Sequence, residues 1–138
     1  MLRPDGSVTV LEGDHGSSYC HPPTAEATRT VECLIEIQQR LGGDPLIGRR
    51  LYPLLCEAGY RNVRVEPRTI YADDSRPDLV EGFSRNTFIA LVEGVRETAL
   101  SLGLVDAATW EKGISDMYRA TEPGGTFCYT FFRGVGLR

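Results

Sequence analysis

The sequence predicts an α/β fold in which three strands and about four helices form one domain over residues 1–138. Three observations support this prediction. The length suits a single domain with a substantial core. Apolar residues recur at helical spacing in some segments and alternate with polar residues in others. Glycine and proline separate these segments, so the expected order is strand, two helices, strand, two helices, strand.

The first strand is expected at about residues 7–12, after a turn at residues 3–6. A polar loop over residues 14–22 should follow it, because glycine, serine and histidine interrupt the apolar pattern there. Since nothing before this strand can pair with it, one of its edges should be left for another chain or for a missing neighbour.

The first helix should begin after Thr24, an N-cap residue, and end at Gly42-Gly43. Its apolar stripe is expected to contain Val31, Leu34, Ile35 and Leu41. The remaining elements are a helix at about 45–58, an alternating strand at about 62–71, a long helical segment at 79–102 that bends at Gly94, a helix capped by Asp106, and a central strand at 126–132.

Four segments resemble class I S-adenosylmethionine-dependent methyltransferases, in the order in which that family has them. Residues 2–11 (LRPDGSVTVL) resemble its turn and fifth strand, and residues 47–60 (IGRRLYPLLCEAGY) its next helix. Residues 61–67 (RNVRVEP) are similar to its sixth strand, and residues 125–132 (GTFCYTFF) to its seventh.

The resemblance implies a partial Rossmann-like methyltransferase fold, with a three-stranded mixed sheet. The last strand would lie antiparallel between the other two. The resemblance also implies S-adenosylmethionine as cofactor and a small-molecule methyl acceptor. The glycine-rich loop and ribose-binding acid of that family are missing, so we expect only the C-terminal, acceptor-side half, with cofactor binding by this chain alone doubtful. The edge of the strand at residues 7–12 would then pair with a second copy or with a separate cofactor-binding half.

Composition excludes several classes. The net charge of −4 and a pI near 5.2 argue against a nucleic-acid partner. No apolar run reaches the length of a membrane span, so we expect a soluble, cytoplasmic protein with no membrane partner. The four cysteines are far apart and lack CxxC spacing, which favours reduced thiols.

The densest polar cluster is the predicted loop at residues 14–22. His15 and His21 are the candidate catalytic residues, as bases near neutral pH, and Asp14 and Tyr19 are candidate substrate-binding residues. Arg49 could hold a substrate carboxylate or phosphate. The alternative is structural: an Asx turn at Asp14, an exposed His21, and arginines that face solvent or pair with Glu57 or Asp44.

Other chemistry is weaker in this loop. A metal site of Asp14, His15, Cys20 and His21 lacks zinc-like spacing and a second ligand pair, so no metal is expected. A Cys20–His21 dyad fails because adjacent side chains diverge, and Ser17 lacks the G-x-S-x-G context. Two functions therefore remain: methyl transfer to a small acceptor, or a non-catalytic homodimeric module that binds a small ligand or a partner.

Overall fold

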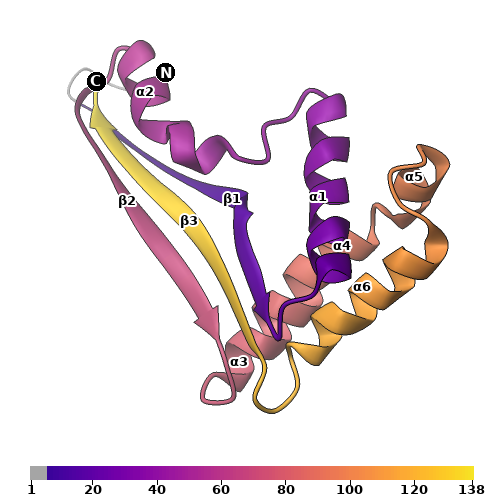
Figure 1. Ribbon diagram of the computed structural model, residues 1–138. Coiled ribbons are helices and arrows are strands. Elements are labelled where there is room, and N and C mark those ends of the chain that lie inside the picture. The colour runs from indigo at the N-terminus through magenta and orange to yellow at the C-terminus, as the bar shows by residue number, and fades with distance from the viewer. Residues whose placement is uncertain (1–5) are drawn as a thin grey trace.

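The computed structural model describes residues 6–138, and the sheet has three strands in the order β1-β3-β2. These are β1 (Ser7–His21), β2 (Arg61–Ala72) and β3 (Thr126–Leu137). The predicted turn at residues 3–6 lies outside the described residues except for Gly6. The predicted α/β class and the central position of the last strand are confirmed (Figure 1).

Both ladders of the sheet are antiparallel, because β3 runs opposite to each of its neighbours. The sheet is therefore antiparallel and not mixed as predicted. The two outer strands do run parallel to each other, but they do not pair. β3 can occupy the centre because it is rich in apolar and aromatic side chains, of which Phe127 and Tyr129 are buried in the core.

The first strand is much longer than predicted. It continues from Ser7 through the expected polar loop to His21. The pairing with β3 shifts between Asp14 and Tyr19, so residues 15–18 bulge out of the ladder. The sequence pattern is interrupted at this bulge, which is why the segment resembles a loop although its far end still pairs with β3.

The helices between β1 and β2 begin with α1 (Ala25–Arg40), whose N-cap is Thr24 as predicted: its side chain accepts a hydrogen bond from the Ala27 N–H. The expected helix at 45–58 is split into a 3₁₀ turn, η1 (Ile47–Arg50), and α2 (Leu51–Glu57). The prediction for Leu41 was wrong, because this residue follows α1 and is 82% exposed.

The segment after β2 is helical from Pro77 to Glu93. It comprises α3 (Pro77–Leu79), a π-helix η2 (Val80–Ile89) and α4 (Ala90–Glu93). The helical segment is interrupted at Gly94, where a bend was predicted, and resumes as α5 (Arg96–Ser101). Asp106 caps α6 (Ala107–Arg119) by accepting a hydrogen bond from the Thr109 N–H.

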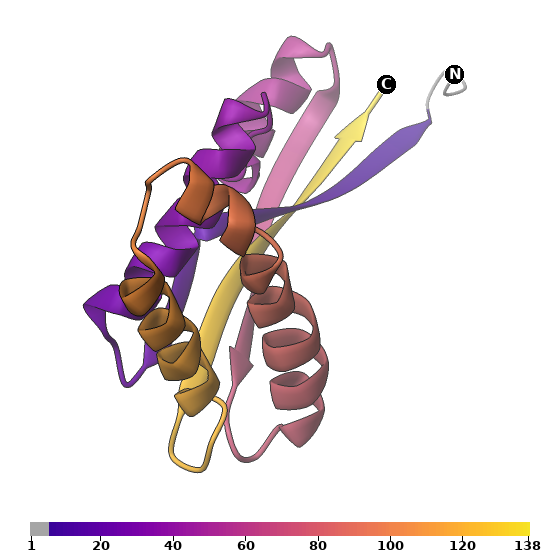
Figure 2. The same ribbon diagram turned by 90° about the vertical axis from the view of Figure 1, so that its right-hand side faces the viewer.

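The two ends of the sheet are covered on opposite faces. At one end, Phe127 and Tyr129 of β3 pack against Phe83 and Phe88 of η2, and α1 and α6 cover the same side (Figures 1 and 2). At the other end, η1 and α2 approach the alternate β3 positions closely: a side chain at Gly134 would collide with Leu55. The main core lies at the first end, around Trp110 and Leu34.

Candidate functional site

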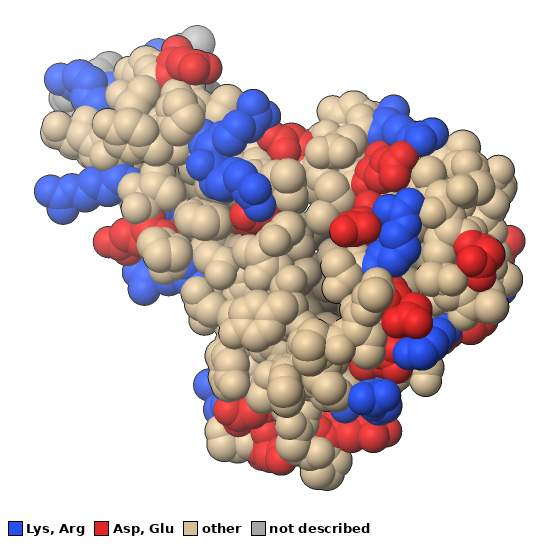
Figure 3. All heavy atoms as spheres, viewed as in Figure 1, with Lys and Arg blue, Asp and Glu red and all other residues tan. Residues whose placement is uncertain are grey.

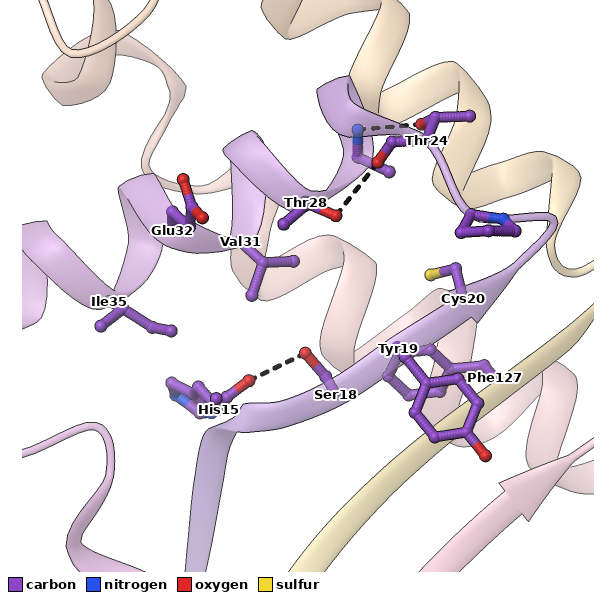
Figure 4. Close-up of a pocket in the computed structure, with 13 residues that line it drawn as sticks. His15, Ser18, Tyr19, Cys20, Thr24, Thr28, Val31, Glu32, Ile35 and Phe127 are labelled. Carbon is purple, nitrogen blue, oxygen red and sulfur yellow. Dashed lines mark hydrogen bonds between the residues drawn. The ribbon is translucent and has the colours of Figure 1, made fainter.

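A pocket of about 300 Å³ lies between the second half of β1 and α1. Val31 and Ile35 of α1 point toward the bulge of β1, where His15 and Ser18 form the opposite wall (Figure 4). The remaining lining residues come from the end of β1, the first turns of α1 and β3: Gly16, Tyr19, Cys20, Pro23, Thr24, Ala27, Thr28, Glu32 and Phe127.

The bulge of β1 is held by hydrogen bonds to its own backbone. The Gly16 N–H donates to Asp14 Oδ1 over 3.0 Å, which is the predicted Asx turn. The Ser17 hydroxyl donates to the Asp14 carbonyl and accepts from the Thr130 N–H of β3. The Ser18 hydroxyl donates to the His15 carbonyl over 2.8 Å. These bonds satisfy polar groups that leave the ladder and fix the wall of the pocket.

Asp14 and Arg49 were predicted to bind substrate, but the structure pairs them with each other. Arg49 Nε and Nη2 donate to the two Asp14 carboxylate oxygens over 2.9 and 2.7 Å. Asp14 is only 4% exposed, and its hydrogen bond raises the pKa of Arg49. Neither residue lines the pocket, so the ion pair joins η1 to the bulge and positions His15 beside it.

His15 is the predicted catalytic residue that the structure places in the pocket wall. Its Nδ1 lies 2.8 Å from the Tyr129 hydroxyl, and its ring packs edge-on against Phe88. Burial lowers the pKa of His15, although Asp14 and a hydrogen bond with Gln38 act in the opposite direction. The imidazole is therefore neutral at pH 7 and contacts both β3 and α1.

Tyr129 is better suited to donate than to accept in this pair. Burial raises its pKa to about 12, so the phenol keeps its proton at neutral pH. The protonated phenol can donate to His15 Nδ1 when the neutral imidazole carries its proton on Nε2.

Tyr19 and His21 lie differently from what their sequence positions suggest. The Tyr19 ring extends from β1 away from α1 and is 53% exposed (Figure 4). It shares a sheet face with Cys128 and Tyr71, its partners across the three strands. His21 is exposed and does not line the pocket. Of the two candidate catalytic histidines, His15 therefore lines the pocket and His21 does not.

Sequence reasoning missed the α1 side of the pocket. Val31 and Ile35 were predicted as part of a core stripe; both are partly buried and line the pocket, and Val31 also packs against the core. Cys20 lies nearby, and burial raises the pKa of its thiol to about 11. The sequence does contain a signal for this wall: the apolar stripe of α1 is wider than packing against a single neighbouring element requires.

The structure gives little support for a bound metal or an adenosyl cofactor. Within residues 6–138, no group of three His, Cys, Asp or Glu could hold a metal ion. Over the same range, the paired glycines do not form a strand–loop–helix cradle. Gly42 and Gly43 follow α1, whereas Gly124 and Gly125 form the turn before β3. The paired glycines therefore do not provide such a cradle for S-adenosylmethionine.

Sequence comparisons leave the family open. No family model matches the chain, and no curated protein matches it. Across the described part of the chain, none of the helices combines the length and apolar character that a bilayer crossing requires.

Proposed function

We propose that this chain binds a small-molecule methyl acceptor in the pocket between β1 and α1, as the acceptor-side part of an S-adenosylmethionine-dependent methyltransferase. The observation that supports this proposal is the pocket itself, which opens beside the second half of β1 and is walled by both β1 and α1. Small-molecule sites in proteins are commonly concave and lined mainly by apolar side chains.

The proposal includes a second polypeptide that holds the cofactor, because the described glycines do not form a cradle for it. The outer edge of β1 is the surface for this partner, since within the described residues β1 pairs with β3 alone. In methyl transfer, this chain would contribute binding and orientation of the acceptor, which are the main requirements of such a step. His15 would contribute part of the pocket wall.

Titration of the chain with small aromatic alcohols tests the acceptor site. Binding should shift the NMR signals of Val31 and Ile35, and Val31→Phe should abolish it by filling the pocket. Gln39→Phe, at an exposed position on the same helix, is the matched control and should bind as the wild type does. Binding that survives Val31→Phe would place the ligand elsewhere and refute the proposed site.

Calorimetric titration with S-adenosylmethionine tests whether the cofactor binds to this chain or needs a second polypeptide. We expect no heat and no thermal shift with this chain alone. Stoichiometric binding would refute the need for a second polypeptide and would assign the cofactor to this chain.

The second candidate is a non-catalytic homodimeric module that binds a small ligand. Two observations favour it: both sides of the His15 ring already have partners, and the edge of β1 is unpaired in the described residues. Sedimentation should then show a dimer that Leu11→Lys disrupts, because Leu11 of β1 is 59% exposed. Leu41→Lys, at a more exposed leucine outside the sheet, should leave the dimer intact. A monomer at all concentrations would eliminate this candidate.

A further inference from the structure

Few of the residues that line the pocket between β1 and α1 carry a charge. Among the described residues that line it there is no lysine or arginine. Its acidic residue is Glu32, whose side chain is 56% exposed at the mouth and pairs with Arg29 over 3.2 Å. Burial lowers the pKa of His15, so the imidazole adds no positive charge at neutral pH. An anionic ligand would therefore enter the pocket without a counter-ion.

The N-terminus of α1 lies near the pocket and could attract an anion, but part of it is already engaged. The Ala27 N–H donates to the Thr24 hydroxyl, and the Thr28 N–H donates to the Thr24 carbonyl. The carboxylate of Glu26 lies in the same first turn, where its negative charge offsets the positive potential of the helix N-terminus. This end of α1 therefore does not compensate for the absence of a cationic side chain.

The body of the pocket is suited to an apolar group. Val31 and Ile35 form one wall, and Phe127 of β3 contributes an aromatic ring. Figure 3 shows uncharged surface between the sheet and α1, whereas acidic and basic side chains follow the outer side of that helix. A volume of about 300 Å³ lies at the lower end of the range for small-molecule sites.

We propose that this pocket selects a small aromatic molecule without negative charge, an alcohol or an amine, and rejects carboxylates and phosphates of the same shape. The inference rests on the proposed function, since it describes the acceptor that would occupy the same site. Its physical basis is the cost of moving an anion out of water into a pocket whose lining holds no cationic side chain.

Three matched probes test this selectivity: 2-(2-naphthyl)ethanol, 2-(2-naphthyl)ethylamine and 2-naphthylacetate. They share one ring system and differ in charge at pH 7.5. Titrated into the full chain by NMR, the alcohol and the amine should each bind at least about tenfold more tightly than the carboxylate, a ratio equivalent to about 1.4 kcal/mol. A carboxylate that binds as tightly as the alcohol would overturn the inference.

Glu32→Gln separates a charge effect from a shape effect. It should strengthen binding of the carboxylate by about two- to fivefold, the range for one partly exposed charge, and leave the alcohol unchanged. Glu36→Gln is the matched control, because Glu36 lies one turn further along α1, pairs with Arg40 and does not line the pocket. An equal gain in both variants would show that the net charge of the helix, not the pocket, discriminates, and would overturn the assignment to Glu32.

The two proposals fail in different ways. If none of the three probes shifts the signals of Val31 and Ile35, the pocket is not a ligand site, and both the proposed function and this inference are refuted. If the alcohol binds there and the carboxylate binds equally well, the acceptor site stands and only its charge selectivity is refuted.

Discussion

Arg49→Ala should destabilise the protein far more than Arg50→Ala, although the two arginines are adjacent in η1. Arg49 pairs with Asp14, which is 4% exposed, through two hydrogen bonds. Arg50 pairs with Asp44, and both of these side chains are in contact with water. Arg49→Ala therefore leaves the buried Asp14 carboxylate without its cation, whereas Arg50→Ala leaves the Asp44 carboxylate in contact with water.

The magnitudes follow from the burial of the remaining partner. Breaking a fully buried ion pair costs about 3–5 kcal/mol. The Arg49 side chain is 49% exposed, so water can reach part of the vacated space, and we expect about 2–3 kcal/mol. For Arg50→Ala we expect about 0–1 kcal/mol, as for exposed pairs. Asp14→Ala should fall between them, because Arg49 can turn into water while the Gly16 N–H loses its acceptor.

Urea unfolding followed by the fluorescence of Trp110 measures these differences, since this single tryptophan is 1% exposed in the core. The m-values should stay unchanged if only the native state is affected. Costs for Arg49→Ala and Arg50→Ala that agree within about 0.5 kcal/mol, the usual scatter of surface substitutions, would refute the reasoning. Arg49→Ala should also weaken binding of the naphthyl alcohol, because the ion pair holds the bulge that forms the pocket wall.

Three further predictions concern the core, the pocket and the thiols. Gly113→Ala should lower the free energy of unfolding in urea by about 1–3 kcal/mol, because its Cβ would lie 2.5 Å from a backbone oxygen of α1. Gly82→Ala is the control: its Cβ would meet nothing within 4 Å, so it should raise the free energy of unfolding by about 0.5–1 kcal/mol. A stabilising Gly113→Ala would contradict this close helix packing. Burial lowers the pKa of His15 in the folded protein, so the unfolded chain binds the histidine proton more readily. The stability that neutral His15 contributes is therefore complete above about pH 6.5 and is lost as the pH falls toward the lowered pKa of the folded state. His15→Gln should flatten the fall in unfolding free energy between pH 7.5 and 5.5, and an unchanged slope would show that burial does not act on this histidine. Iodoacetamide at pH 8 should label exposed Cys56 well before Cys20, because the pKa of about 11 leaves roughly 0.1% of Cys20 as thiolate. Peptide mass spectrometry measures the two labelling rates, and equal rates would mean that the Cys20 thiol is not buried.

The features predictable from the sequence were those that local chemistry determines. Thr24 and Asp106 cap their helices because a side-chain oxygen meets an N–H three residues away. The apolar and aromatic character of residues 126–132 correctly indicated a central strand. These signals need no knowledge of distant residues.

The features that sequence reasoning missed depend on distant contacts. Residues 14–22 resemble a loop, and only pairing with β3 makes them part of a strand. The π-helix η2 likewise has no local signature beyond the Thr87 hydroxyl, which donates to the Gly82 carbonyl five residues earlier. Arg49 was predicted to bind substrate or, alternatively, to pair with Glu57 or Asp44, and the sequence could not identify Asp14, 35 residues away, as its partner.

The central place of β3 has a consequence for how the chain acquires its structure during synthesis. The other two strands each pair with β3 and not with each other, so their backbones have no ladder partner until this late segment leaves the ribosome. One bond between β1 and β3 joins residues that are 113 positions apart. Such long-range pairing slows folding and lengthens the time for which unpaired strands are exposed to other nascent chains. Chaperone capture should therefore concentrate on β1 before β3 is made.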